Sequence, residues 1–184
     1  AEADAYVQQI NWLLENGAKI DAIGAQGHFS QDKVVDPVVV ENRLNNLAST
    51  GLPIWITEFD TTAVDVEMRA DNLEKLYRIA FSNPNVEGII MWGFHADSHW
   101  RGSNAALVDS NWTVNEAGLR YQALREEWRT NDSGTTDNSG NYSFRGFHGE
   151  YEVTISAPGS APVVTSIYLE PGDGIASYKI LPDG

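Results

Sequence analysis

The chain has 184 residues, of which 42% are hydrophobic, so it can bury one substantial core and still carry a small appendage. Its 26 acidic and 12 basic residues give a formal net charge of -14, which disfavours nucleic acid and membrane surfaces as partners. The chain contains no cysteine, so disulfides, thiolate metal sites and cysteine nucleophiles are excluded. It shows neither a membrane-length apolar stretch nor a signal-peptide pattern at its start.

Helices and strands are expected to alternate along the first two thirds of the chain. The helices are indicated by apolar residues at helical spacing, by Asp or Asp-Pro at their starts and by glycines at their ends. Short apolar runs define the strands. In chain order the sequence predicts a helix over 6–14, a strand over 20–23, a helix over 37–51, a strand over 52–57, a helix from Asp65 to before Pro84, a strand over 86–92 and a helix over 115–128.

The predicted strand ends are separated by about 33 residues, the length of one βα unit, which implies a parallel sheet. Such units build either an open doubly wound sheet or a (β/α)₈ barrel, and both place functional groups at the carboxyl ends of the strands. The polar and aromatic residues there are Gln26 and His28, then Glu58 and Asp60, then the segment 92–100. We expect them to meet at one mouth.

The segment 54–60, Ile-Trp-Ile-Thr-Glu-Phe-Asp, is the most informative one. An apolar run of this kind is typical of a buried parallel strand, and acids are poor occupants of its end unless chemistry requires them. Glu58 and Asp60 therefore indicate a catalytic site.

Five segments carry a family resemblance: 24–28 (Gly-Ala-Gln-Gly-His), 55–60, 91–94 (Met-Trp-Gly-Phe), 98–101 (Ser-His-Trp-Arg) and 115–118 (Asn-Glu-Ala-Gly). In order and spacing they resemble the last three βα units of a glycoside hydrolase family 10 xylanase. The resemblance implies the C-terminal portion of a (β/α)₈ TIM barrel. It also implies retaining, endo-acting hydrolysis of β-1,4-xylosidic bonds in xylan or xylo-oligosaccharides, with no metal and no cofactor.

The resemblance also implies roles for single residues. Glu58 takes the position of the nucleophile, and His28 and Asp60 are expected to hold and tune its carboxylate. The substrate-binding residues implied in the same way are Gln26, Trp92, Trp100 and Arg101.

Elementary chemistry agrees with these roles. A retaining glycosidase needs one ionised carboxylate and a second carboxylic acid about 5 to 5.5 Å away. A histidine can stabilise the ionised form of Glu58, and Asp60 can fix the tautomer of that imidazole. Tryptophan faces provide apolar area that matches the C–H face of a pyranose.

Each role has a structural alternative. Glu58 could be a salt-bridged acid at a barrel rim, His28 a satisfied half-buried histidine, and Asp60 a turn cap. Gln26 could bond only to backbone, and Trp92 could belong to the core. His95 and His99 have a spacing that suits a metal on a helix, but the surrounding residues favour a loop.

The resemblance covers too little of the barrel for catalysis by this chain alone. The first five strands are missing, and in the family they carry the acid/base Glu. We therefore expect the 184 residues to pack against an N-terminal complement, a separate chain or fragment, and to be active only when completed by it. The main alternative is a noncatalytic carbohydrate-binding or matrix protein of the same fold. An Asn-Glu at the end of an upstream strand would favour the enzyme.

The composition changes after residue 129, so we predict a catalytic portion over 1–129 and a linker with a small β-sandwich-like module over 130–184. Short alternating runs separated by Gly and Pro predict antiparallel strands there. The segment 142–149 resembles the tail of plant and animal family 10 members. Tyr142, Phe147 or Tyr151 could bind sugar, but a structural role is favoured. Sequons at Asn111, Asn131 and Asn141 favour a secreted protein.

Overall fold

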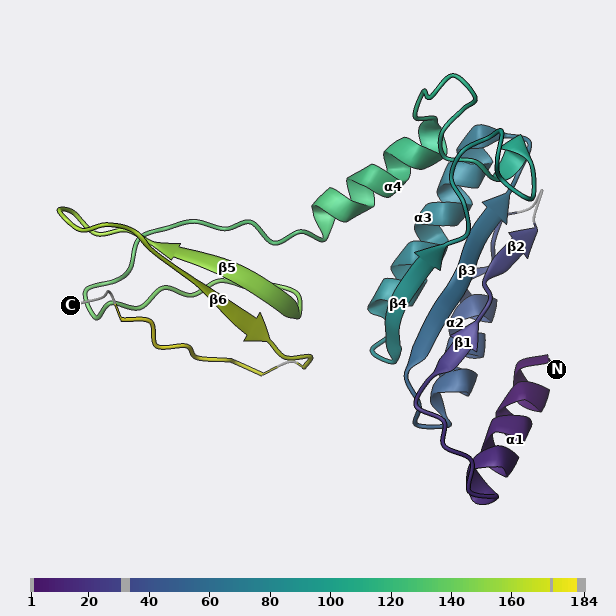
Figure 1. The fold of residues 1–184 in the computed structure, drawn as a ribbon, viewed down its shortest axis with the longest axis horizontal. Coiled ribbons are helices and arrows are strands. Elements are labelled where there is room, and N and C mark those ends of the chain that lie inside the picture. Colours follow the sequence, from purple (N-terminus) through teal and green to yellow (C-terminus); the bar gives the residue numbers. More distant parts are fainter. Residues whose placement is uncertain (1, 31–33, 173, 182–184) are drawn as a thin grey trace. The chain divides into compact units, whose positions relative to one another are not determined.

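The computed structural model describes residues 2–30, 34–172 and 174–181. The chain divides into two compact units, Ala1–Arg125 and Glu126–Gly184, which are described separately. The elements, labelled in Figure 1, are α1 (Glu2–Glu15), β1 (Ile23–Ala25), β2 (His28–Ser30), α2 (Pro37–Ala48), β3 (Ile54–Thr62), α3 (Val66–Ser82), β4 (Val86–Met91), the 3-10 turn η1 (Ser103–Ala105), α4 (Glu116–Glu127), β5 (Gly149–Ile155) and β6 (Val163–Leu169).

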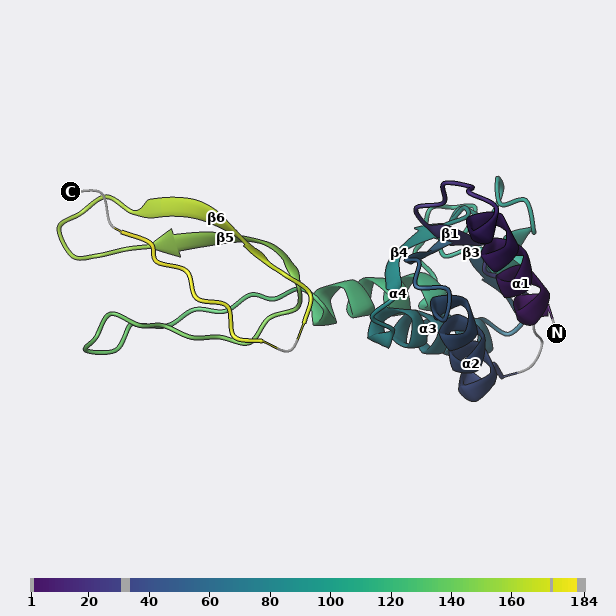
Figure 2. The same cartoon turned by 90° about the horizontal axis from the view of Figure 1, so that it is seen from below.

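A parallel sheet forms the centre of the first unit, as predicted. The long strand β3 pairs with β1 and then β2 along one edge, and with β4 along the other. Figures 1 and 2 show α2 and α3 along one face of the sheet. The carboxyl ends of the strands therefore meet at one edge, where parallel sheets place their sites.

The helix starts follow the predicted capping residues. The Asp36 side chain accepts a hydrogen bond from the backbone N–H of Val38 at 3.0 Å, with Pro37 in the first turn. Asp65 likewise accepts from the N–H groups of Glu67 and Met68. These bonds satisfy donors that a helix start leaves unpaired.

Aliphatic side chains of the helices and strands form the core of this unit. Ile54 on β3 is fully buried, and it packs with side chains from α1, α2 and β1. The buried members of this cluster are Val7, Ile10, Ile23, Leu44, Leu47 and Ile54. Their burial fixes the sheet against the helices and so sets the position of the strand ends.

Two predicted strand boundaries are wrong. The strand predicted over 20–23 begins only at Ile23, because pairing starts where Ile23 lies opposite Ile54. The strand predicted over 52–57 extends to Thr62, because its second half pairs with β2 in the register His28–Asp60 to Ser30–Thr62. Glu58 and Asp60 therefore lie within β3 rather than beyond its end.

The second unit contains an antiparallel hairpin of β5 and β6, paired from Gly149–Leu169 to Ile155–Val163. Among the residues that the structure describes, the alternating runs around 142–144 and 175–180 form no strand, so this unit has fewer strands than its sequence pattern predicts. Tyr151 donates its hydroxyl hydrogen bond to the Phe147 carbonyl at 2.5 Å, and its ring contacts that of Phe144. These contacts support the structural role favoured for Tyr151.

Candidate active site

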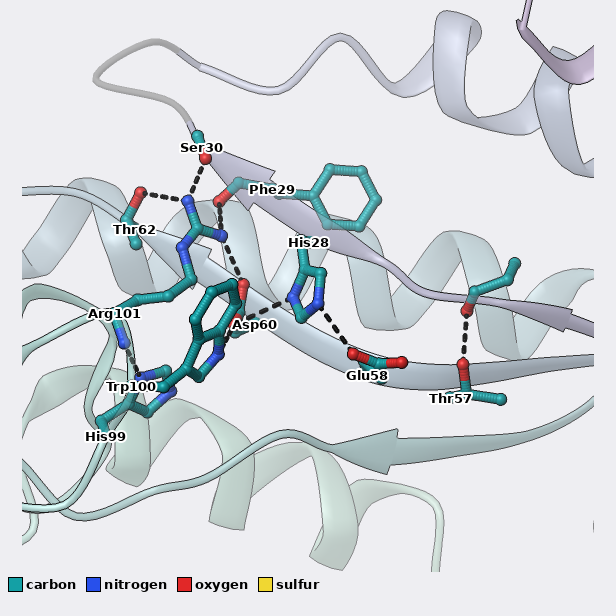
Figure 3. Close-up of polar contacts among 11 residues, drawn as sticks. His28, Phe29, Ser30, Thr57, Glu58, Asp60, Thr62, His99, Trp100 and Arg101 are labelled. Atoms are coloured by element: carbon teal, nitrogen blue, oxygen red, sulfur yellow. Dashed lines mark hydrogen bonds and ion pairs between the residues drawn. The ribbon is translucent and has the colours of Figure 1, made fainter.

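Three segments bring the predicted site residues together at the carboxyl ends of the strands. His28 starts β2, Glu58 and Asp60 lie in the second half of β3, and Trp100 and Arg101 lie in the connection between β4 and α4. Figure 3 shows their side chains converging on one cluster. The expectation of a common mouth is confirmed for His28, Glu58, Asp60 and Trp100, and Arg101 lies with them in Figure 3.

An irregularity in β3 turns both acids away from the helices. Side chains at positions 56 and 59 of a regular strand point to opposite faces, yet Ile56 and Phe59 both line the cavity against α2 and α3. Phe59 packs edge-to-face on Tyr77 of α3 at 4.8 Å. The pairing register between β3 and β4 shifts between these two residues. This bulge turns Glu58 and Asp60 away from the helices.

Gly27 allows β2 to start beside this half of β3. Its φ is +84°, and a Cβ atom there would lie 2.5 Å from Cγ2 of Ile56, so a larger residue is disfavoured by both conformation and space. The backbone N–H of Glu58 donates to the Gln26 carbonyl at 2.7 Å, and that of Asp60 donates to the Gly27 carbonyl at 3.3 Å. These two hydrogen bonds hold the turn before β2 against β3.

His28 bridges the two acids. Its Nε2 lies 3.0 Å from Oε2 of Glu58, and its Nδ1 lies 3.1 Å from Oδ2 of Asp60. Each ring nitrogen thus has its own carboxylate partner, so the orientation of the imidazole is fixed from both sides.

Asp60 is the most enclosed of the site residues. Its carboxylate is fully buried, which requires compensating partners. Besides His28, it accepts from Nε1 of Trp100 at 3.1 Å and from Nη1 of Arg101 at 2.5 Å. The turn-cap alternative does not describe this residue, since its carboxylate bonds to side chains from two other segments.

Arg101 directs its guanidinium to protein groups. Its side chain is 14% exposed, and besides Asp60 it donates to the Phe29 carbonyl and to the hydroxyls of Ser30 and Thr62. Residue-by-residue reading of the sequence missed Ser30 and Thr62. The two-residue period of a strand could have indicated them, because Ser30 lies two residues after His28 and Thr62 lies two residues after Asp60. A substrate contact by Arg101 stays a prediction.

Trp100, Trp92 and Gln26 lie around this cluster, and each of them is exposed. Trp100 is 62% exposed and meets the His28 ring edge-to-face at 5.0 Å. Trp92 is 44% exposed in this chain, which argues against the core alternative. Gln26 is also exposed, and its backbone carbonyl serves Glu58. An open cavity of about 490 Å³ adjoins Trp100 and Arg101, with Thr62, Ala63, Val64 and Asn104 as its other lining residues.

His95 and His99 were the residues of the metal alternative. In the part of the chain that the structure describes, no group of three or more His, Asp or Glu side chains could hold a metal ion. His99 is buried, and its Nδ1 accepts from the Arg101 backbone N–H at 3.2 Å. Burial lowers the pKa of His99, with nearby Asp60 opposing the effect, so the neutral form is favoured.

Comparison with known proteins identifies the family. The sequence model of glycosyl hydrolase family 10 matches residues 1–126, which is more than half of the chain. The chain belongs to glycosyl hydrolase family 10. Together with the parallel sheet, this membership confirms that the first unit is part of a (β/α)₈ barrel.

Curated relatives match both units of the chain. The chain is 47% identical over 97% of its length to the anti-sigma-I factor RsgI6 of Acetivibrio thermocellus, and covers 24% of that protein. It is 38% identical over 92% of its length to endo-1,4-beta-xylanase 1 of Arabidopsis thaliana, and covers 18% of it. The chain therefore spans about a quarter or less of these relatives.

Solved family 10 structures match the barrel portion. Xylanase 10B from Thermotoga maritima is 25% identical with a TM-score of 0.60, over 66% of this chain and 41% of that one. Xylanase 10B from Thermotoga petrophila, solved in complex with xylobiose, is 26% identical with a TM-score of 0.58, over 65% and 40% of the two chains.

Among the described residues of this chain, none of the helices has the length and apolar character needed to cross a membrane.

Proposed function

We propose that the protein containing this chain hydrolyses internal β-1,4-xylosidic bonds of xylan with retention of configuration, with Glu58 as the nucleophile. The observation that carries the proposal is the His28 bridge between Glu58 and the buried Asp60. A pure binding protein has no need of a carboxylate held by an imidazole that a buried acid orients. A retaining glycosidase needs a carboxylate that stays ionised until it attacks.

The geometry assigns a part of the reaction to each group. His28 holds Oε2 of Glu58, and Figure 3 shows the other carboxylate oxygen pointing away from the imidazole. That oxygen attacks the anomeric carbon and forms a glycosyl-enzyme ester while the bond to the leaving sugar oxygen breaks, and the acid/base carboxyl of the proposed complement supplies the proton to that oxygen. His28 orients the attacking carboxylate, and buried Asp60 holds the ring. Water then hydrolyses the ester.

The substrate is proposed to lie over the exposed tryptophans. Trp92 and Trp100 are exposed and are proposed to offer their ring faces to sugar units, and Gln26 is proposed to bond to a sugar hydroxyl near the cleaved linkage. Aromatic faces bind pyranose rings through apolar contact. Support for xylan comes from the Arabidopsis relatives named as endo-1,4-beta-xylanases and from the Thermotoga petrophila complex with xylobiose.

The acid/base carboxyl is proposed to come from an N-terminal complement of the barrel. In the described part of the chain, β1, β2 and β4 each pair only with β3, so two edges of the sheet have open hydrogen-bonding groups. Trp55 and Ile90 also leave more than a third of their surface exposed on the strands. Further strands would pair these edges and cover these side chains.

The first experiment compares hydrolysis with binding in the barrel-containing protein. Glu58→Gln removes the nucleophile but keeps the shape, so kcat on xylan should fall by about 10³-fold or more while xylo-oligosaccharide binding, measured by calorimetry, persists. Glu41→Gln on the exposed face of α2 is the matched control and should change neither. Unchanged turnover of Glu58→Gln would remove Glu58 from this role.

A regulatory binding module is the second candidate function. The observation that favours it is the 47% identity over 97% of the chain with a protein named as an anti-sigma-I factor, which covers the hairpin unit as well as the barrel portion. In this case the Trp92 and Trp100 surface would capture polysaccharide as a signal. Binding of xylo-oligosaccharide without release of products by the wild-type protein would favour this candidate.

We propose an extracellular location. The sequon asparagines Asn111, Asn131 and Asn141 are all exposed, as glycan attachment requires, and a polymeric substrate lies outside cells. Detection of the protein in culture medium tests the proposal, and its retention inside cells would contradict it.

A further inference from the structure

Arg101 reaches all three segments that build the site. Its backbone N–H bonds to Nδ1 of His99 in the connection after β4. Its guanidinium donates to the Phe29 carbonyl and the Ser30 hydroxyl at the end of β2, and to Thr62 and Asp60 on β3. One side chain thus ties together the elements that carry His28, Glu58 and Trp100.

The contact with Asp60 is direct and enclosed. The Nη1–Oδ1 distance is 2.5 Å, the Asp60 side chain is fully buried, and the Arg101 side chain is 14% exposed. The other carboxylate oxygen accepts from His28 and from Trp100. Arg101 therefore balances the charge of an acid whose second oxygen orients the imidazole on the nucleophile.

We propose that Arg101 is a positioning residue for the reaction, which acts on Glu58 through Asp60 and His28 rather than by binding sugar. The contacts form a line from Arg101 to Asp60, His28 and Glu58. Without the guanidinium, buried Asp60 loses its fixed counter-charge, and the imidazole loses its fixed acceptor. The inference rests on the proposed hydrolysis and deepens it.

Kinetics separate positioning from substrate binding. In the barrel-containing protein, Arg101→Ala should lower kcat on xylo-oligosaccharides by about 10²-fold, as for other misplaced catalytic groups, with KM changed less than about two-fold. Arg101→Lys keeps the charge but lacks the planar fork, so it should recover only part of kcat. A rise in KM at unchanged kcat would overturn the proposal and make Arg101 a substrate-binding residue.

Chemical rescue tests the same point on one folded variant. The open cavity beside Trp100 gives external guanidinium a route to the space that Arg101→Ala leaves. Millimolar guanidinium should raise kcat of this variant several-fold, and should not raise that of wild type or of Arg129→Ala, whose exposed pair with Glu126 makes it the control. Equal responses of all three proteins would contradict the proposal.

NMR of the His28 ring tests the role of Arg101 without requiring hydrolysis. In wild type, ¹⁵N-histidine NMR should show a protected Nδ1–H on His28, and Arg101→Ala should lose it. Arg101→Lys, which keeps the charge at this position, should retain it in part. If wild type hydrolyses nothing, the proposed function fails, while this signal still decides whether Arg101 positions His28. An unchanged signal in Arg101→Ala would overturn the inference.

Discussion

Asp60 accepts hydrogen bonds from three side chains although its carboxylate is fully buried. The three donors belong to His28, Trp100 and Arg101, and two of them can carry positive charge. Removing one partner of a buried charged pair leaves the other without compensation, which costs more than the pair contributes when intact. The Asp60 carboxylate therefore stabilises the fold and also holds the side chains of the site in position.

Asp60→Asn should lower the unfolding free energy by about 3 kcal/mol because Arg101 loses its buried partner. Urea denaturation of the barrel-containing protein measures this loss. The control is Asp71→Asn, whose side chain is 56% exposed in its pair with Arg120, and which should cost less than about 1 kcal/mol. Equal losses in the two variants would show that Asp60 is no more enclosed than a surface acid.

His99 gives the site unit a pH dependence of known sign. Burial lowers its pKa below the ordinary 6.5, so the unfolded chain binds a proton that the folded chain does not. The unfolding free energy should therefore fall as the pH drops through 6.5, where the unfolded imidazole takes up its proton. His99→Asn, which keeps an acceptor near the Nδ1 position, should remove this part of the slope between neutral and acid pH. Parallel curves for wild type and variant would contradict the assignment.

At this scale the sequence predicted which residues meet but not all of what they do. Glu58, His28 and Asp60 were expected to contact one another because parallel strands end at one edge. The guanidinium of Arg101 was expected to face sugar. Its actual targets depend on the register of β2 against β3, which residue types alone do not set.

The bulge in β3 determines which face of the sheet Glu58 and Asp60 occupy. Regular alternation would place Glu58 and Asp60 on the helix side with Ile54 and Ile56, and would turn Phe59 away from the helices. The register shift restores Phe59 to the helix side and leaves both acids on the other. No residue type signals this shift, so the sequence could not predict it.

Gly118 in α4 offers a test of element packing. A Gly to Ala change inside a helix usually stabilises it by about 1 kcal/mol. Here a Cβ atom would collide with the Leu107 carbonyl and the Val114 side chain. Gly118→Ala should therefore lower the unfolding free energy by about 1–3 kcal/mol, measured by urea denaturation. Gln122→Ala, exposed on the same helix, is the control and should change it little, and a stabilised Gly118→Ala would contradict this packing.

At the scale of the whole molecule, the barrel portion leaves strand edges open and apolar side chains exposed. The exposed set on the strands includes Trp55 and Ile90. Such surface is expected to seek a partner. The family and the parallel sheet followed from the sequence, whereas the hairpin unit formed fewer strands than its alternating pattern predicted.

Residues 1–184 produced alone should therefore bind a hydrophobic dye and self-associate. Addition of the N-terminal barrel segment should give a one-to-one complex with less dye binding, measured by size exclusion with light scattering. A monomeric chain that binds no dye and has a cooperative unfolding transition would contradict the need for a complement.

Trapping of the covalent glycosyl-enzyme tests whether Glu58 is the nucleophile. The barrel-containing protein is incubated with a 2-fluoro-xylobioside that carries a good leaving group, then digested and analysed by tandem mass spectrometry. The account predicts one added disaccharide on the peptide that contains Glu58, and none in Glu58→Gln. A label on another residue, or hydrolysis of xylan without any label, would contradict it.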